Sequence, residues 1–449
     1  MAKYKAYPEY KDSGVEWFDV RPLSWKVTRL KLETFMNMGQ SPSSDDCNIE
    51  GDGLAFLQGN AEFGKVNPIE KQYCPVPKKI ANPGDILFSV RAPVGAMNFA
   101  DKKYGIGRGL CSIAASAKLT SPFLWWLLPT YKYQLDAIAT GSTFEAVSAE
   151  QLGNLCFALP SISEQSQIAA FLDHETAKID NLIEKQQQLI ELLKEKRQAV
   201  ISHAVTKGLN PDVPMKDSGV EWLGKVPEHW TIAQLKFNTI EMQTGPFGSQ
   251  LHAEDYVVDG IPLINPAHMN AGMIIPDPKV TVDEATQERL GRHKLSEGEI
   301  IFSRRGELGR CAVVKKNNEG WLCGTGSLKA KLTKKIIPDY AYTLISSEGV
   351  VSELTLESKG STMANLNTET LGRIRLPVPP ISEQEAILDY IKIISDKYDY
   401  LIRSADTAIR LMQERRTALI SAAVTGKIDV RDWVAPDTQN VEEPQEATA

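Results

Sequence analysis

A short set of charged residues in the second half of the chain has the letters of a metal-dependent nuclease. Asp339 is followed by Glu357 and Lys359. In such nucleases carboxylates hold a magnesium ion and a lysine assists the attacking water. The pattern is loose and arises often by chance. The equivalent positions of an internal repeat, residues 138–140, carry no charged group. A Mg-dependent nuclease carried by these three residues is therefore an alternative and not the leading hypothesis.

The other residue types that do chemistry form no catalytic pattern in the sequence. It has no Gly-rich phosphate loop that ends in Lys-Ser or Lys-Thr, and no dinucleotide-binding fingerprint. The six cysteines and six histidines lack the spacing of metal ligands. We therefore expect reduced thiols, no bound metal and no bound cofactor.

Two Gly-rich stretches, residues 84–109 and 298–326, combine arginine with serine at similar spacing. Arginine can donate to guanine edges or phosphates in a bidentate way, and glycine lets a backbone approach a ligand closely. A Gly-Ser-Thr triplet later in each half offers groups suited to phosphate oxygens, although it is also an ordinary turn sequence. The paired recurrence favours a DNA-binding face. Its predicted residues are Ser89, Arg91, Arg108, Gly141, Ser142, Thr143, Ser303, Arg304, Arg305, Arg310, Gly360, Ser361 and Thr362.

These stretches belong to a repeat that runs through nearly the whole chain of 449 residues. The heptapeptide KDSGVEW at 11–17 returns unchanged at 216–222, a shift of 205. The tetrapeptide ISEQ at 162–165 returns at 381–384, a shift of 219. A period of this size indicates two whole domains, each with its own core. We expect a pseudo-two-fold molecule with extra length in the loops of the second copy.

Each copy ends in a long segment with apolar residues at steps of three and four. Each segment has about 40 residues, so a helix would be about 60 Å long at roughly 1.5 Å per residue. Such a helix must bury its apolar stripe, and the nearest partner is the other copy. The alternative is that each helix packs on its own domain. We predict an antiparallel coiled coil that holds the two domains apart. Its predicted seam residues are Ile168, Leu172, Ile179, Leu182, Leu193, Val200, Ile387, Ile391, Tyr398, Leu401, Met412 and Leu419.

The charge distribution separates the end of the chain from the rest. Net charge is −7, which alone argues against a nucleic-acid partner. Six acidic residues against one arginine follow Ile428, whereas residues 289–335 carry twelve Lys or Arg and four Glu. The longest apolar run, residues 123–128, is too short to cross a bilayer. We expect a cytoplasmic protein with no membrane partner.

The duplicated motifs resemble those of the specificity subunits (HsdS family) of type I restriction-modification systems. The residues that carry the resemblance are KDSGVEW with Trp25, residues 84–89, Gly-Ser-Thr, and Ile-Ser-Glu-Gln before a long helix. The resemblance covers about residues 10–429. It implies two target recognition domains, each reading one half of a bipartite double-stranded DNA target. It also implies that the paired helices set the gap and dock the modification subunits.

The resemblance further implies a division of labour within a host-defence complex. Two modification (methyltransferase) subunits would bring S-adenosylmethionine for DNA methylation, and restriction subunits would add ATP- and Mg-dependent cleavage. This chain would be a non-catalytic subunit that binds none of these cofactors itself. The first copy has Ala92-Pro93 where the second has Gly306-Glu307, so contacts cannot be transferred directly between the copies.

The predicted fold class is α+β, with two mixed α/β recognition domains separated by two long helices in an antiparallel coiled coil. A coiled-coil adaptor without DNA binding remains the second alternative. It differs from the leading hypothesis because such an adaptor, together with its modification partner, would not protect a bipartite DNA duplex. The predicted segments are 1–160 (target recognition domain 1), 161–209 (central helix), 210–379 (target recognition domain 2), 380–428 (C-terminal helix) and 429–449 (acidic disordered tail).

Overall fold

The computed structural model describes residues 4–43, 46–140, 146–306, 308–358 and 366–435. The chain divides into two compact units. Unit 1 comprises residues 1–187 and 406–449, and unit 2 comprises residues 188–405. Both units combine short strands with helices, and both contain part of each long helix. Among the described residues, no helix is long and apolar enough to span a membrane.

The centre of unit 1 is a four-stranded antiparallel sheet in the order β4-β11-β8-β9. In β8, Ile86 and Phe88 enter the main core, whereas Leu87 enters a second core on the opposite face. This alternation follows the two-residue period of a strand, and it explains why the short run is apolar throughout. The strands are β4 (Thr34–Met38), β11 (Leu110–Ala115), β8 (Ile86–Ser89) and β9 (Met97–Phe99).

The second core of unit 1 lies under a smaller sheet in the order β6-β5-β10-β7, in which β5 and β10 are parallel. Its strands are β5 (Leu54–Leu57), β6 (Tyr73–Cys74), β7 (Ile80–Ala81) and β10 (Tyr104–Ile106). The remaining elements are β1 (Tyr10–Val15), β2 (Phe18–Pro22), β3 (Lys26–Arg29), β12 (Cys156–Leu159), α1 (Leu30–Glu33), α2 (Ser121–Leu127), α3 (Lys132–Thr140) and α4 (Ala149–Gly153).

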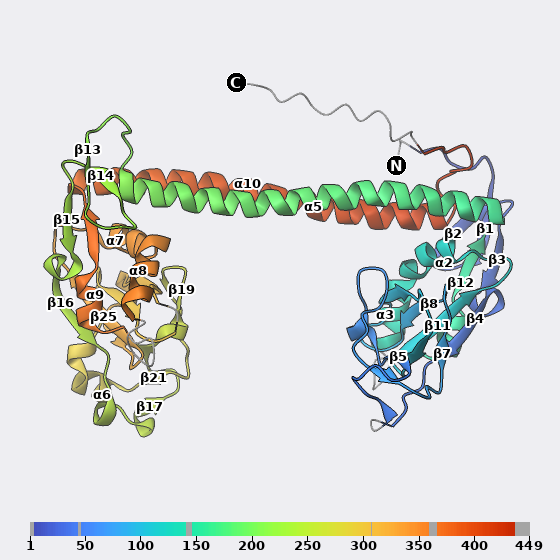
Figure 1. Cartoon of the computed structure of the whole chain (residues 1–449), viewed down its shortest axis with the longest axis horizontal. Helices are drawn as coiled ribbons and strands as arrows, with labels where there is room; N and C mark the ends of the chain where they lie inside the picture. The colour runs from blue at the N-terminus through green and yellow to red at the C-terminus, as the bar shows by residue number, and fades with distance from the viewer. Residues whose placement is uncertain (1–3, 44–45, 141–145, 307, 359–365, 436–449) are drawn as a thin grey trace. The chain divides into compact units, whose positions relative to one another are not determined.

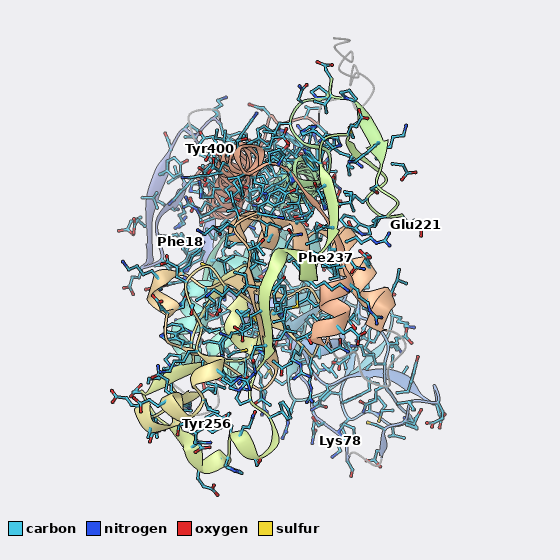
Figure 2. The ribbon with its side chains drawn as sticks, turned by 90° about the vertical axis from the view of Figure 1, so that its left-hand side faces the viewer. Phe18, Lys78, Glu221, Phe237, Tyr256 and Tyr400 are labelled. Carbon is cyan, nitrogen blue, oxygen red and sulfur yellow. The ribbon has the colours of Figure 1, made fainter. Side chains whose placement is uncertain are left out.

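Unit 2 repeats this plan with the sheet order β16-β25-β22-β23. The strands of this sheet are β16 (Thr239–Thr244), β22 (Ile300–Ser303), β23 (Cys311–Val313) and β25 (Ser327–Leu332). Within the unit, Tyr256 on the smaller sheet lies at the end opposite to Tyr400 on the helix pair (Figure 2).

The smaller sheet of unit 2 has the order β17-β21-β18-β24, and hairpins and short helices complete the unit. These elements are β13 (Met215–Asp217), β14 (Lys225–Pro227), β15 (Thr231–Gln234), β17 (Tyr256–Val257), β18 (Ile261–Ile264), β19 (Met269–Asn270), β20 (Met273–Ile274), β21 (Thr281–Val282), β24 (Leu322–Cys323), β26 (Arg375–Val378), α6 (Glu284–Arg289), α7 (Pro338–Ile345), α8 (Glu348–Ser358) and α9 (Thr368–Arg373).

The repeated heptapeptide has the same turn in both units. Gly14 and Gly219 have φ angles of +69° and +68°, a region that favours glycine. The amide of each glycine donates to the aspartate two residues earlier, at 2.7 Å and 2.9 Å. The repeat of these letters is thus explained by a local turn.

The two long helices are α5 (Ile162–Lys207) and α10 (Ile381–Val424). They run side by side and antiparallel within each unit (Figure 1). In unit 1, Arg416 Nε donates to Asp180 Oδ1 at 2.8 Å, and in unit 2 Arg197 lies 2.6 Å from Asp399. The residue numbers of both pairs add to 596, so one antiparallel register holds in both units. This confirms the predicted fold class.

Buried and half-buried positions along α5 follow the heptad spacing of a coiled coil. They are Ile179, Ile183, Gln186, Ile190, Leu193, Arg197, Val200 and Ala204. Of the predicted seam residues, Ile168, Leu172, Ile179, Leu193, Val200, Ile387, Ile391, Tyr398, Met412 and Leu419 are buried or half-buried.

Two of the predicted seam positions are wrong. Leu182 is 52% exposed and Leu401 is 37% exposed. The next residue in each helix, Ile183 or Ile402, takes the inward position. Both predictions failed for the same reason. Where two apolar residues are adjacent, the sequence alone does not show which of them faces the other helix.

A buried glutamine anchors the start of each long helix. Gln165 and Gln384 are both 0% exposed. The Gln384 side chain accepts from the Ile337 amide at 2.8 Å and donates to the carbonyls of Lys335 and Pro379 at 2.9 Å and 2.8 Å. Gln165 makes the same three bonds in unit 1. The repeated Ser-Glu-Gln therefore joins each helix to the domain that precedes it.

The glutamate before each glutamine holds a buried tryptophan of the same unit. Trp25 Nε1 donates to Glu164 at 3.2 Å, and Trp230 Nε1 donates to Glu383 at 2.5 Å. Both indoles are 1% exposed. These bonds satisfy the only donor of each indole where water is excluded.

The predicted disordered tail begins too early. Val430 is 2% exposed, and the Asp429 amide donates to the Lys5 carbonyl at 2.8 Å. The Trp433 ring packs on Phe171 with centroids 5.5 Å apart. Residues 429–435 are therefore part of unit 1, and residues 436–449 lie outside the described part of the chain. The other predicted domain limits stay predictions.

Candidate nucleic-acid interface

In each unit, the end of the central strand of the main sheet meets the Gly-rich loop and the segment after the Gly-Ser-Thr triplet. In unit 1 the Val90 amide donates to the Gly109 carbonyl at 3.0 Å, and the Val147 amide donates to the Val90 carbonyl at 2.9 Å. In unit 2 the Arg304 amide donates to Gly326, and the Leu366 amide donates to Arg304, at 2.9 Å and 2.8 Å. We call this region the recognition edge of each unit.

The glycines of the recognition edge are explained by contacts within the protein. A Cβ on Gly107 would lie 2.6 Å from the Gln58 side chain, and a Cβ on Gly324 would lie 2.3 Å from the Asn265 side chain. Such distances leave no room for a side chain. The glycines thus admit a crossing segment of the same unit, whereas the sequence had suggested approach to a ligand.

Two predicted DNA-binding residues are in the wrong place for contact with a ligand. Ser89 is 1% exposed and Ser303 is 0% exposed. Their hydroxyls donate to the carbonyls of Arg91 and Arg305 at 2.9 Å and 2.6 Å. Both serines hold the turn that follows the central strand, so their recurrence reflects the scaffold.

The predicted arginines differ in their freedom to reach a ligand. Arg91, Arg108 and Arg305 are exposed. Arg304 and Arg310 are half-buried and donate to backbone carbonyls, those of Leu366 at 3.3 Å and Pro266 at 3.4 Å. The edge therefore presents exposed guanidinium groups in both units, on turns that backbone hydrogen bonds fix.

The predicted triplets Gly141, Ser142, Thr143 and Gly360, Ser361, Thr362 lie outside the described residues. The described residues that follow the two triplets belong to the recognition edge. Ala146 pairs with Arg91 as an isolated bridge, and the Leu366 amide bonds the Arg304 carbonyl. The role of the triplets stays a prediction.

Sequence reasoning missed a polar hollow beside Arg108. The hollow has a volume of about 380 Å³, and its lining includes Ser41, Gln58, Gln72 and Arg108. The Ser41 hydroxyl accepts from the Arg108 amide at 3.2 Å, and Gln58 Nε2 donates to that hydroxyl at 2.9 Å. Arginine and glutamine are the side chains that pair best with guanine and adenine edges. These residues have no repeat in the second copy, so the repeat could not reveal them.

The corresponding positions of unit 2 carry different side chains. The parallel strand pairs place Asn265 where unit 1 has Gln58 and Thr325 where unit 1 has Arg108. Phe247, 62% exposed, follows β16 in this region. A shared backbone thus presents two different sets of polar and apolar groups.

The basic stretch at residues 289–335 does not form one continuous face. Lys329 is 6% exposed and lies 3.3 Å from the equally buried Glu299. Lys315 pairs with Asp339 at 2.6 Å. Lys329 is therefore not available at the surface, and Lys315 is neutralised by a carboxylate from outside the stretch, so fewer basic groups are exposed than the sequence had indicated.

Of the three residues of the nuclease alternative, the structure describes the side chain of Asp339 alone. Asp339 lies in the first turn of α7 and pairs with Lys315. Lys359 and the side chain of Glu357 lie outside what the structure describes. Within the described ranges, no group of three or more His, Cys, Asp or Glu side chains could hold a metal ion.

Burial raises the pKa of the Cys111, Cys311 and Cys323 thiols to about 12, which keeps them protonated.

The family model described as "Type I restriction modification DNA specificity domain" matches the chain twice, at residues 36–192 and 239–403. The two matches fall one in each half of the repeat and together span well over half of the chain. The chain belongs to this family. It is a specificity subunit of a type I restriction-modification system, with two tandem DNA specificity domains.

Named relatives are type I specificity subunits from bacteria and archaea. The EcoBI specificity subunit of Escherichia coli is 22% identical over 95% of this chain and 90% of its own length. A Methanocaldococcus jannaschii protein assigned as the MjaX specificity subunit is 39% identical, over 39% of this chain and 42% of its own length.

Solved structures support the fold of this specificity subunit. A chain from a study of complex assembly and conformational transition of the type I restriction-modification system has a TM-score of 0.67, at 16% identity, over 91% of this chain and 99% of that chain. The HsdS subunit of Thermoanaerobacter tengcongensis has a TM-score of 0.54, at 15% identity, over 91% of this chain and 98% of its own. At these identities the likeness shows the fold alone.

Proposed function

We propose that this specificity subunit reads a bipartite double-stranded DNA target, with one half-site read by the recognition edge of each unit. The observation that carries the proposal is the pair of edges with one scaffold and different side chains. Arg108, Gln58 and Ser41 occur in unit 1, where unit 2 has Thr325 and Asn265. Two such edges suit two different half-sites, because base edges are distinguished by the donors and acceptors offered to them.

The long helices set the gap between the half-sites and dock two modification subunits. α5 has 46 residues, so it is about 69 Å long at roughly 1.5 Å per residue. Apolar residues also lie outside the seam of each unit. Leu182 and Leu411 in unit 1 are 52% and 53% exposed, and Leu192 and Tyr400 in unit 2 are 61% and 66% exposed. Exposed apolar residues on two neighbouring helices suit further helices of a partner.

The subunit itself is non-catalytic in this proposal. The modification subunits supply S-adenosylmethionine and methyl transfer, and restriction subunits supply the ATP- and Mg-dependent steps. Methylation within duplex DNA requires the target base to leave the stack, and the assembled complex provides that energy. The present chain supplies the sequence specificity.

Neutralising exposed arginines tests the recognition edge. In the complex with modification subunits, Arg108→Ala with Arg305→Ala should weaken DNA binding and flatten its salt dependence. Each lost phosphate contact lowers the slope of log K against log salt by about 0.9. Arg410→Ala, an exposed arginine on α10, is the matched control. Unchanged affinity and slope in the double variant would remove these edges from the interface.

A paired insertion tests the role of the helices. Seven residues added to both α5 and α10, at positions matched by the register, lengthen each helix by about 10 Å and preserve the heptad. Methylation mapping should then show both half-sites unchanged with a different gap. Altered half-sites with the original gap would contradict the proposed division of labour.

A further inference from the structure

The end of the helix pair in unit 1 is covered by segments from both ends of the chain. The Trp433 ring lies 5.5 Å from the ring of Phe171 and 5.3 Å from the ring of His174. Tyr4 packs on Phe171 with ring centroids 5.3 Å apart. Phe171 is 0% exposed as a result.

The equivalent surface of unit 2 is open among the residues that the structure describes. At the shift of 219, Tyr390 corresponds to Phe171 and Ile393 to His174. Tyr390 is 37% exposed and Ile393 is 66% exposed. The two residues on which Trp433 rests in unit 1 are thus exposed apolar side chains in unit 2.

Chain connectivity explains the difference between the units. In unit 2, α5 ends at Lys207 and residues 208–214 lead directly into β13. Unit 1 instead receives two segments at this place, one before β1 and one after α10. Leu209 shows the effect, because it is 43% exposed whereas Ile428, its counterpart at the same shift, is 3% exposed.

The uncovered surface includes a groove of about 600 Å³. Its lining is mainly apolar and includes Val200, Leu209, Met215 and Tyr390, with His203 and Lys207 beside them. A groove of this size accommodates a large side chain with part of its backbone.

We propose that this groove of unit 2 is a docking site for a partner protein segment that presents a tryptophan or tyrosine side chain. The aromatic ring rests on Tyr390 and Ile393, as Trp433 rests on Phe171 and His174. An acidic residue next to the aromatic suits the Lys207 ammonium, which lines the groove and donates to the carbonyls of Leu223 and Lys225. The two halves of this duplicated chain therefore offer unequal docking surfaces, one filled by the chain itself and one open.

The test uses the full chain and a synthetic peptide with the sequence of residues 427–435. A photoreactive benzophenone amino acid replaces the tryptophan, and mass spectrometry maps the cross-links. We expect adducts within 200–215 and 390–393, and competition by the unmodified peptide but not by its Trp433→Ala form. The double variant Tyr390→Ser, Ile393→Ser should reduce labelling at least tenfold. Leu209→Asp should also reduce it, because Leu209 lines the same groove.

Leu189→Ser is the matched control, because Leu189 is an exposed apolar residue of α5 in unit 2 that lies outside the groove. It should leave labelling unchanged. The altered residues are exposed, so the variants retain the fold, which circular dichroism checks. Adducts confined to residues 4–10 and 167–175 would mean exchange with the chain's own segment. That result, absence of labelling, or labelling unaffected by the groove variants would overturn the proposal.

Discussion

Replacing Gln384 by alanine should destabilise unit 2 and leave unit 1 intact. Gln384 is fully buried and makes three hydrogen bonds, one from the Ile337 amide and two to backbone carbonyls. Each such bond contributes about 1 kcal/mol net, and a buried group left without a partner costs about 1–3 kcal/mol. The expected loss is therefore about 3 kcal/mol of the free energy of unfolding of unit 2, which corresponds to roughly a hundredfold change in an equilibrium constant.

Hydrogen exchange followed by mass spectrometry resolves the two units in one experiment. Amides of β22 in the core of unit 2 should exchange roughly a hundredfold faster in Gln384→Ala, since their exchange follows the opening of the unit. Amides of β8 in unit 1 should be unchanged. Gln165→Ala should give the opposite pattern, because Gln165 makes the same bonds in unit 1.

The matched control is Gln188→Ala, an exposed glutamine on α5 within unit 2. It should change exchange by less than about threefold, as surface substitutions usually do. A change below tenfold in β22 for Gln384→Ala would refute the anchoring role of the glutamine. Equal changes in β8 and β22 would refute the independence of the two units.

Three further perturbations test the packing of unit 2. Gly324→Ala should lower the melting temperature sharply, because the new Cβ would lie 2.7 Å from a backbone carbonyl oxygen. Gly291→Ala is the control and should be neutral, because no atom lies within 4 Å of its Cβ. Equal effects of the two substitutions would contradict the close crossing of another segment at Gly324. Lys329→Met should lower the free energy of unfolding, measured by urea denaturation, by about 3–5 kcal/mol, because it leaves the buried Glu299 without its ion-pair partner. Adding Glu299→Leu should restore much of this stability. If the double variant shows no recovery, the two residues do not act as a pair. Burial lowers the pKa of His293 below 6.5, so the neutral form is favoured on folding. Stability should therefore fall as pH drops below about 6.5, and His293→Gln should flatten that dependence; an unchanged pH profile would contradict it.

The sequence predicted the long helices well because their signal is local and periodic. Steps of three and four over both copies defined the stripe, and the matching apolar residues at the shift of 219 gave a second observation of it. The errors at Leu182 and Leu401 arose where an adjacent isoleucine fits the stripe equally well. Only packing against the partner helix decides between neighbours of similar hydrophobicity.

The recognition edge was predicted less well, because the residues that recur in both copies are those that maintain the shared backbone structure. Ser89 and Ser303 recur since both hold a turn, and Gly107 and Gly324 recur since both are crossed by another segment. Residues that differ between the copies, such as Gln58, gave no signal. In the proposed function, those differences allow the two recognition edges to read different half-sites.

The packed end of the chain was missed for a related reason. The acidic composition after Ile428 predicted disorder, yet Val430 and Trp433 are apolar and pack on unit 1. Average composition hid two well-spaced anchors.

We propose that this specificity subunit directs methylation to a two-part DNA sequence, one part for each unit. Single-molecule methylation mapping of DNA from cells that express the chain with its modification subunit tests this most directly. We expect one motif with two defined halves and an undefined gap, and replacement of residues 36–160 by the same region of a relative should change one half alone. A continuous motif, or a replacement that changes both halves, would contradict it.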